Sequence, residues 1–210
     1  MHLTAPALTS PPAYGRDAAQ YDIRTGAFER YRRQLVELLP LGGGEVVLDV
    51  GCGTGLCFAL LHERVGPGGT VVGVDASREM LGLAAERVAA NGWTNVVLVE
   101  SPVEDADIPG VADHALFCAV HDVLQSGRAL DNVLDHVRDG GTVAAGGGKW
   151  AAPWAAPLNA GVLALHAPYV RDFTGFDRPW ARLAERVPGL AVQQVALGAG
   201  YVAAGPVRPG

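Results

Sequence analysis

Three glycines at alternating positions, Gly51, Gly53 and Gly55, follow an apolar run that contains the acid Asp49. The run 46–50 predicts a buried strand and residues 56–65 predict a helix, so the glycines form a tight turn between the two. Glycine has no Cβ atom to block close contact, and the amides of such a turn attract a negatively charged group together with the positive end of the helix. The turn therefore predicts a ligand site at the end of the strand.

A second acid, Asp75, ends the next apolar run, 70–74. An acid at the end of the second strand of a Rossmann-like site accepts hydrogen bonds from adjacent ribose hydroxyls, since two carboxylate oxygens can accept from both at once. Dinucleotide sites have the spacing G-x-G-x-x-G, but here Leu56 holds the place of the third glycine. This spacing disfavours a nicotinamide cofactor, while an ordinary tight turn without a ligand remains an alternative.

The acid placed two residues before G-x-G-x-G resembles the S-adenosylmethionine loop of the class I (Rossmann-like) methyltransferases, of small-molecule type. The segment 73–77 together with Met80 strengthens the resemblance, which covers residues 14–146. It implies S-adenosyl-L-methionine as the cofactor. Many relatives carry an aspartate near Pro102 that is missing here, so Val103 or Glu104 is expected to contact the adenine, and a solvated acidic loop is the alternative. The cofactor-binding residues so implied are Tyr21, Asp49, Gly51, Cys52, Gly53, Asp75, Ala76, Met80, Val103, Glu104 and Ala119.

His121 and Asp122 follow the predicted fourth strand, 114–119, and are the candidate catalytic residues. Methyl transfer needs few protein groups, because the cofactor carries the reactivity and the protein supplies position and exclusion of water. A hydroxyl or carbon-acid acceptor would profit from a base, and histidine titrates near neutral pH. Asp122 would orient the imidazole or begin a helix, and a structural role for His121 is the alternative. His166 and Lys149 rank below this pair.

The segment 146–188 is rich in aromatic residues and prolines and lies outside the regular strand and helix pattern. Because proline limits regular helix, short helical pieces and loops are expected near the carboxyl ends of the strands, where open α/β sheets bind ligands. The aromatic side chains form either an apolar lid over a substrate pocket or a cap on the core. The substrate-binding candidates are Tyr14, Trp150, Trp154, Phe173 and Phe176.

The alternation of predicted strands and helices indicates an α/β fold with a doubly wound, mostly parallel sheet and helices on both faces. Runs at 70–74, 96–100, 114–119 and 142–145 supply further strands, and 190–197 with 199–204 supply a final pair. The resemblance implies a seven-stranded sheet in which one strand of this pair is antiparallel. Residues 1–13 are expected to form a flexible tail, and 14–210 a single domain with a lid insertion at 146–188.

The formal net charge of −6 opposes a nucleic-acid partner, which usually requires a basic face. Three cysteines without metal-ligand spacing suggest neither a disulfide framework nor a metal site. No apolar run is long enough to cross a membrane and residues 1–13 lack the pattern of a signal peptide, so a cytoplasmic protein without membrane insertion is expected.

The fourth strand also lacks the N-P-P-Y or D-P-P-Y tetrapeptide of amino-methylating nucleic-acid enzymes. These features favour methyl transfer to a small, largely apolar metabolite. A lipid or quinone precursor as the acceptor, a non-catalytic S-adenosylmethionine-binding protein and a nicotinamide-dependent oxidoreductase are the alternatives. The oligomeric state and the attacking atom stay open.

Overall fold

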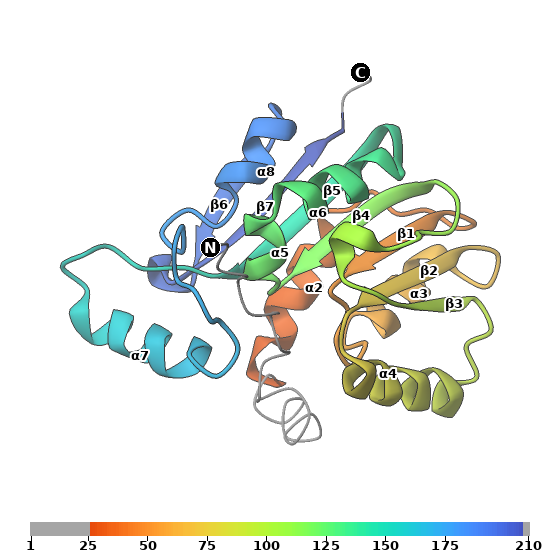
Figure 1. The fold of residues 1–210 in the computed structure, drawn as a ribbon, viewed down its shortest axis with the longest axis horizontal. Helices are drawn as coiled ribbons and strands as arrows, with labels where there is room; N and C mark the ends of the chain where they lie inside the picture. The colour runs from red at the N-terminus through yellow and green to blue at the C-terminus, as the bar shows by residue number, and fades with distance from the viewer. Residues whose placement is uncertain (1–25, 208–210) are drawn as a thin grey trace, which may run out of the picture.

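A computed structural model describes residues 26–207, and Figure 1 shows a single twisted sheet between two layers of helices. The seven strands lie in the order β3-β2-β1-β4-β5-β7-β6. Only β7 runs antiparallel to its neighbours. This arrangement confirms the predicted seven-stranded, mostly parallel sheet. The strands are β1 (Val46–Val50), β2 (Thr70–Asp75), β3 (Val96–Glu100), β4 (Ala112–Cys118), β5 (Val137–Gly148), β6 (Ala191–Val195) and β7 (Gly200–Pro206).

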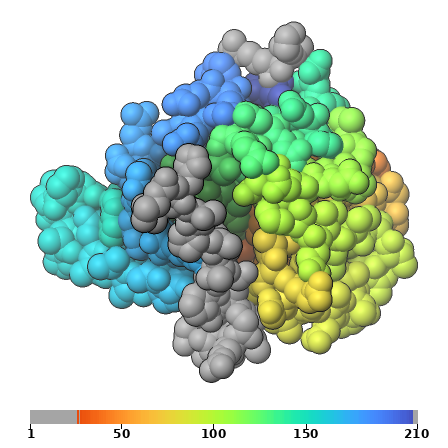
Figure 2. Space-filling model, in the orientation of Figure 1, coloured from red at the N-terminus to blue at the C-terminus, as the bar shows by residue number. Residues whose placement is uncertain are grey.

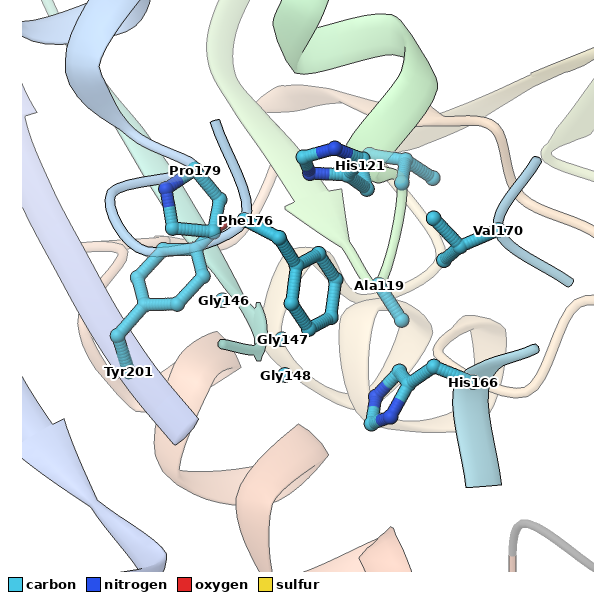
Figure 3. A pocket seen from close by; sticks show the side chains of 11 residues that line it. Ala119, His121, Gly146, Gly147, Gly148, His166, Val170, Phe176, Pro179 and Tyr201 are labelled. Atoms are coloured by element: carbon cyan, nitrogen blue, oxygen red, sulfur yellow. The ribbon is translucent and has the colours of Figure 1, made fainter. Parts of the chain in front are cut away.

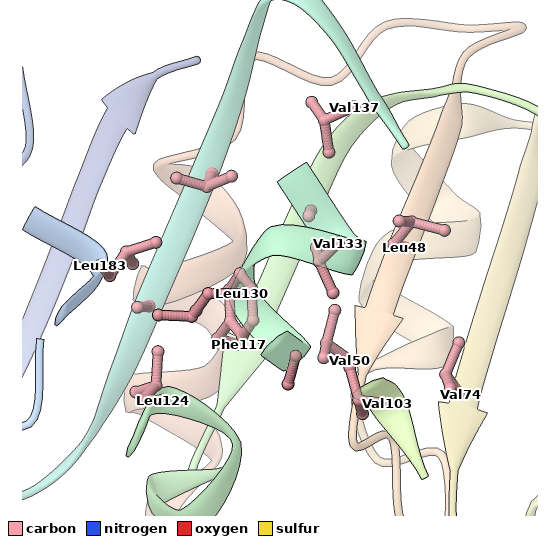
Figure 4. Packing of buried hydrophobic residues seen from close by; sticks show 14 of the residues in the cluster. Leu48, Val50, Val74, Val103, Phe117, Leu124, Leu130, Val133, Val137 and Leu183 are labelled. Atoms are coloured by element: carbon pink, nitrogen blue, oxygen red, sulfur yellow. The ribbon is translucent and has the colours of Figure 1, made fainter. Parts of the chain in front are cut away.

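The helices divide between the two faces of the sheet, and each face has its own apolar cluster. One cluster packs α2, α3 and α4 against the sheet, and the other packs α5, α6 and α8. Successive residues of β1 show the division, since Val47 belongs to the first cluster and Leu48 to the second. Figure 4 shows the second cluster, in which Leu124, Leu130 and Leu183 lie over β4 and β5. The helices are α2 (Glu29–Glu37), α3 (Phe58–Val65), α4 (Arg78–Asn91), α5 (His121–Gln125), α6 (Gly127–Asp135), α7 (Ala156–His166) and α8 (Ala181–Arg186), with short 3-10 turns η1 (Gly26–Phe28), η2 (Val103–Asp105) and η3 (Ala196–Gly198).

Helix α4 begins and ends where its sequence predicts. The Ser77 side chain accepts a hydrogen bond from the Met80 amide at 3.3 Å, which satisfies a donor of the first turn. Gly92 ends the helix in the left-handed conformation, with φ at 67°. The cap fixes the direction in which the chain leaves Asp75, and with it the position of that side chain.

Two boundaries differ from the sequence prediction. The helix after the glycine turn begins at Phe58 and not at Leu56, because Gly55 has a φ of 76° and the turn continues to Cys57. The fifth strand begins at Val137, several residues before the predicted start, because β5 already pairs with β4 at Ala112 across an irregular register. The preceding helix α6 therefore ends at Asp135.

The segment after β5 contains a regular helix, α7, of 11 residues, which the prolines had argued against. Pro157 lies in the first turn, where its missing N–H and its fixed φ are compatible with a helix. Figure 1 shows α7 standing off from the sheet, and only Val162 of this helix is buried. Helix α7 thus forms a wall outside both apolar clusters. No helix among residues 26–207 is both long and apolar enough to cross a membrane.

Candidate active site

A cavity of about 1120 Å³ lies at the carboxyl ends of the parallel strands, between the glycine turn and α7. Figure 2 shows the molecule hollowed between the cyan and blue segment that follows β5 and the yellow and green half that carries β2 to β4. Ligand pockets usually have volumes of about 300 to 1,000 Å³. The cavity is therefore large enough for a cofactor and a second small molecule together.

The glycine turn forms one wall of this cavity, in a conformation that requires glycine. Gly51, Gly53 and Gly55 have φ values of 64°, 55° and 76°, in the left-handed region. A Cβ atom at Gly51 would lie 2.5 Å from the Val120 side chain, whereas a Cβ atom at Gly53 would meet nothing within 4 Å. Gly51 is thus required by packing against the start of α5, while the space beside Gly53 belongs to the cavity.

Asp75 ties this turn to the end of β2. Its Oδ2 atom accepts from the Gly53 amide at 2.8 Å, and its Oδ1 atom accepts from the Ser77 amide at 2.8 Å. Burial raises the pKa of Asp75, and these amide contacts oppose that rise. Each carboxylate oxygen can accept more than one hydrogen bond, so Asp75 keeps acceptor capacity toward a ligand in the cavity.

Asp49 is a buried carboxyl group with an unsatisfied oxygen. Its side chain lines the cavity, is 2% exposed, and its Oδ2 atom has no hydrogen-bond partner among residues 26–207. Burial, with a further contribution from nearby Asp75, raises the pKa of Asp49 to about 8. A cationic ligand group, or one that donates a hydrogen bond, would supply the partner that the Oδ2 atom of Asp49 lacks.

The structure brings together at this cavity all the predicted cofactor-binding residues that it describes. Tyr21 and the substrate candidate Tyr14 lie outside the described residues. The lining set comprises Asp49, Gly51, Cys52, Gly53, Asp75, Ala76, Met80, Val103, Glu104 and Ala119, together with His121 and Asp122.

His121 lines the cavity, but its ring is held by the backbone and not by Asp122. Its Nε2 atom lies 3.2 Å from the Thr174 carbonyl oxygen and therefore carries the hydrogen, because a carbonyl can only accept. Its Nδ1 atom is buried and has no hydrogen-bond partner within the described part of the chain. The imidazole therefore donates no hydrogen bond to Asp122 among these residues, and Asp122 lies instead in the first turn of α5, which was the alternative for this residue.

The aromatic candidates separate into different environments. Trp150, Phe173 and Phe176 pack on one another, with ring centroids 5.0 to 5.3 Å apart. Of the four candidates that the structure describes, none lines this cavity, and Phe176 lines a smaller cavity beside it. Trp154 is 86% exposed to solvent. The structure therefore does not bring Trp150, Trp154 or Phe173 to the cavity. Trp150 and Phe173 pack on Phe176, and Trp154 points into solvent.

Lys149, the other basic candidate of this segment, is held by the backbone. Its Nζ atom donates to the Trp150 carbonyl oxygen and, at 3.1 Å, to the Gly198 carbonyl oxygen. Burial lowers the pKa of Lys149. These contacts join the end of β5 to η3, which is a structural role.

The far wall consists of a helix face that the sequence prediction missed. The α7 residues that line the cavity are Leu158, Gly161, Val162, Leu165 and His166, spaced three and four apart as one face of a helix is. This spacing is visible in the sequence, but the surrounding prolines argued against a helix there. The smaller cavity that adjoins this wall is shown in Figure 3, with Phe176 between His121 and His166.

Comparison with known proteins agrees with this geometry. Residues 47–141 match a family model described as a methyltransferase domain. A demethylmenaquinone methyltransferase of Symbiobacterium thermophilum is 30% identical over 131 residues, which cover 60% of this chain and 51% of that protein. A nocamycin O-methyltransferase of Saccharothrix syringae is 42% identical over 85 residues, or 40% of this chain and 30% of that protein. The chain thus spans about half the length, or less, of these curated relatives.

A solved structure shows the same fold at low identity. The N-methyltransferase NodS of Bradyrhizobium japonicum, in complex with S-adenosyl-L-homocysteine, aligns with a TM-score of 0.66 and 18% identity. The alignment covers 95% of this chain and 98% of that one. Residues 47–141 thus match a methyltransferase domain, and the described chain has the class I (Rossmann-like) methyltransferase fold.

Proposed function

We propose that this chain is a methyltransferase that uses S-adenosyl-L-methionine to methylate a small, largely apolar metabolite. The observation that carries the proposal is one cavity with two unlike walls. One wall holds the glycine turn, the buried acid Asp49 and the half-buried acid Asp75, and the other is the apolar face of α7. When bound, S-adenosylmethionine supplies a methyl group on a positively charged sulfur atom.

The residues of the first wall fit that cofactor. The unsatisfied Oδ2 atom of Asp49 faces a cavity in which a cationic ligand group would be favoured. Asp75 would accept from the ribose hydroxyls, and Met80 and Val103 would pack on the adenine. Gly51 and Gly53 leave room for the methionine part, since no Cβ atom fills the space beside Gly53. Each of these roles belongs to the proposal.

The second wall supports a small acceptor with an apolar body. Leu158, Val162 and Leu165 contribute aliphatic surface to the cavity, and Phe176 lines the smaller cavity beside it. The negative net charge of −6 argues against a nucleic-acid acceptor. The relatives named for demethylmenaquinone and nocamycin favour a quinone precursor or another polycyclic metabolite as the acceptor class. The cytoplasmic location stays a prediction.

Two measurements test this proposal. Calorimetry with S-adenosylmethionine, S-adenosylhomocysteine and NAD should give binding of the first two and none of NAD. Transfer of a labelled methyl group to a panel of phenols and hydroquinones should then give an organic-soluble product. Absence of S-adenosylhomocysteine binding would refute the proposal. Binding without transfer to any panel member would favour the non-catalytic alternative.

A further inference from the structure

His166, the last residue of α7, has a defined neutral tautomer. Its Nδ1 atom lies 2.9 Å from the Val162 carbonyl oxygen, one helical turn earlier. A carbonyl oxygen can only accept a hydrogen bond, so Nδ1 carries the hydrogen and the lone pair resides on Nε2. The helix therefore presents one unprotonated ring nitrogen in a fixed direction.

This nitrogen faces the carboxyl end of β5. A Cβ atom at Gly148, the last residue of the strand, would lie 2.1 Å from Nε2, so only glycine leaves room for the ring. His166 lines both the large cavity and the smaller one beside it. Figure 3 shows the ring close to Ala119 and Gly148, on the side of Phe176 opposite to His121. Nε2 has no hydrogen-bond partner among residues 26–207, which leaves it available to a ligand.

His121 differs from His166 in what it can offer. Its hydrogen-bearing Nε2 atom is engaged by the Thr174 carbonyl, and its lone-pair nitrogen is buried without contact to solvent. Both rings pack edge-on against Phe176, with centroid distances of 5.0 Å for His121 and 5.3 Å for His166. A ligand can reach the lone pair of His166, whereas that of His121 is shielded.

The surroundings keep His166 neutral at physiological pH. Burial lowers the pKa of His166, the hydrogen bond to Val162 opposes this effect, and the charge of protonated His121 would lower the pKa further. The other groups packed against the ring, Gly148 of β5 and Phe176, carry no charge. A neutral imidazole in an apolar wall is in the correct state to accept a proton.

We propose that Nε2 of His166 is the general base that removes the proton from a phenolic or enolic hydroxyl acceptor. This inference rests on the proposed function and specifies its acceptor and its base. The O–H bond breaks, its proton passes to Nε2, and its electron pair stays on the oxygen, which bonds to the methyl carbon. The carbon–sulfur bond breaks with its electron pair left on sulfur. The imidazolium then releases its proton to water.

The acceptor class follows from the base and the walls. A histidine whose pKa lies below its ordinary value of about 6.5 ionises a phenol or enol far more readily than an alkyl alcohol. Val170 and Phe176 line the smaller cavity and Val162 lines the large one, and this apolar surface suits a flat or aliphatic body next to the hydroxyl. The hydroxyl would face Nε2, and the remainder would lie along α7.

Contact between Nε2 and a hydroxyl acceptor can be tested without the cofactor, with 4-nitrophenol as the probe. The phenol is added to protein labelled with nitrogen-15 in histidine, at a pH below the pKa of the free phenol. We expect the His166 ring to show hydrogen on Nδ1 before addition, and the Nε2 resonance to shift as the phenol hydroxyl donates to it. An unchanged Nε2 resonance of His166 or no binding of the phenol would overturn the inference.

Two matched variants separate the histidines. His166→Asn keeps a donor near the Val162 carbonyl but has no Nε2, and should bind the phenol more weakly. His121→Gln keeps a donor toward Thr174 and should bind the phenol and shift the Nε2 resonance of His166 as the parent does. The reverse result would assign the hydroxyl contact to His121. If His166→Asn does not fold, the nitrogen-15 spectrum of the parent protein decides alone.

Calorimetry with S-adenosylhomocysteine on the same proteins separates this inference from the proposed function. Intact S-adenosylhomocysteine binding with no contact between the phenol and Nε2 of His166 would refute only the base. Failure of the parent to bind S-adenosylhomocysteine would refute the methyltransferase function itself.

Discussion

The carboxylate of Asp75 accepts a hydrogen bond from the Gly53 amide at 2.8 Å, which joins the end of β2 to the glycine turn after β1. The same carboxylate accepts from the Ser77 amide at the start of α4. One side chain thus holds both the turn and the helix start that border the proposed cofactor position. Asp75 therefore shapes the turn, and in the proposed function it also accepts from the ribose hydroxyls.

We predict that Asp75→Ala weakens S-adenosylhomocysteine binding by about 1.5 to 3 kcal/mol, the usual value of hydrogen bonds to a charged group. Calorimetry measures the loss. Asp113→Ala is the matched control, because Asp113 also accepts from a backbone amide, that of Val46 at 2.8 Å, but at the opposite end of the sheet. The control should lose stability and keep its affinity. Equal affinity in Asp75→Ala and the parent would exclude the ribose contact.

Gly53→Val should abolish cofactor binding while the protein still folds cooperatively. A side chain at this position projects into the cavity and meets nothing within 4 Å, but the φ of 55° imposes strain of roughly 1 to 2 kcal/mol. Gly44→Val is the control, since Gly44 has a φ of 91°, an equally open surrounding and no place in the cavity lining. Binding of S-adenosylhomocysteine should survive only in the control. Similar affinities in the two variants would contradict the assignment.

The stability of the ligand-free protein should fall as the pH rises from about 4 to about 8. The folded state holds the Asp49 proton up to about pH 8, whereas the unfolded chain releases it near the ordinary value of 3.8. The folded state therefore binds more protons than the unfolded chain in this window, and the free energy of unfolding decreases with pH. The decrease is on the order of several kcal/mol, since each unit of pKa difference corresponds to about 1.4 kcal/mol.

Asp49→Asn should remove most of this dependence. Urea unfolding of the parent and the variant at pH 5, 7 and 9 measures it, and the slopes are compared because the new amide group has its own hydrogen-bond requirements. Addition of S-adenosylmethionine, a cation, should stabilise the parent more at pH 9 than at pH 5. Parallel curves for the two proteins would show that Asp49 is ionised in the folded state throughout.

Truncation of Phe176 should lower the stability of the protein, whereas truncation of Trp154 should leave it almost unchanged. Phe176 is 1% exposed and contacts four rings, so Phe176→Ala should cost roughly 3 to 5 kcal/mol of unfolding free energy. Trp154 is 86% exposed, so Trp154→Ala should leave the thermal midpoint almost unchanged. If the Trp154 variant kept its midpoint and its cofactor affinity but lost turnover, Trp154 would belong to the acceptor site after all.

The side of the cavity formed by the glycine turn, where we propose the cofactor, was predictable because short-range sequence patterns determine its structure. An apolar strand that ends on an acid, glycines that must adopt positive φ, and the Ser77 cap all act within a few residues of one another. The parallel order of β1, β2 and β4 then brings their carboxyl ends to one edge. Asp49, Asp75 and Ala119 therefore meet at the position that sequence alone indicated.

The other side of the cavity, where we propose the acceptor, depends on contacts between residues far apart in the sequence, which local sequence patterns do not predict. The hydrogen on His121 is set by the carbonyl of Thr174, which lies far along the chain, and not by adjacent Asp122. Trp150 packs on Phe173 because the chain between them folds back on itself, and no periodic pattern in the sequence predicts this contact. The face of α7 is an exception, because its three- and four-residue spacing is readable once Pro157 is accepted as a first-turn residue.

Helix α7 packs outside both apolar clusters, and the matched methyltransferase domain ends at residue 141, before this helix begins. Its inward side chains other than the buried Val162 can therefore be exchanged with little effect on folding or on the glycine turn. A library randomised at Leu158, Gly161 and Leu165 would show whether this face sets the acceptor preference in the proposed function, while His166 and the glycine turn stay constant. On that proposal, α7 is a separable part of the chain through which the acceptor can change while the cofactor is kept.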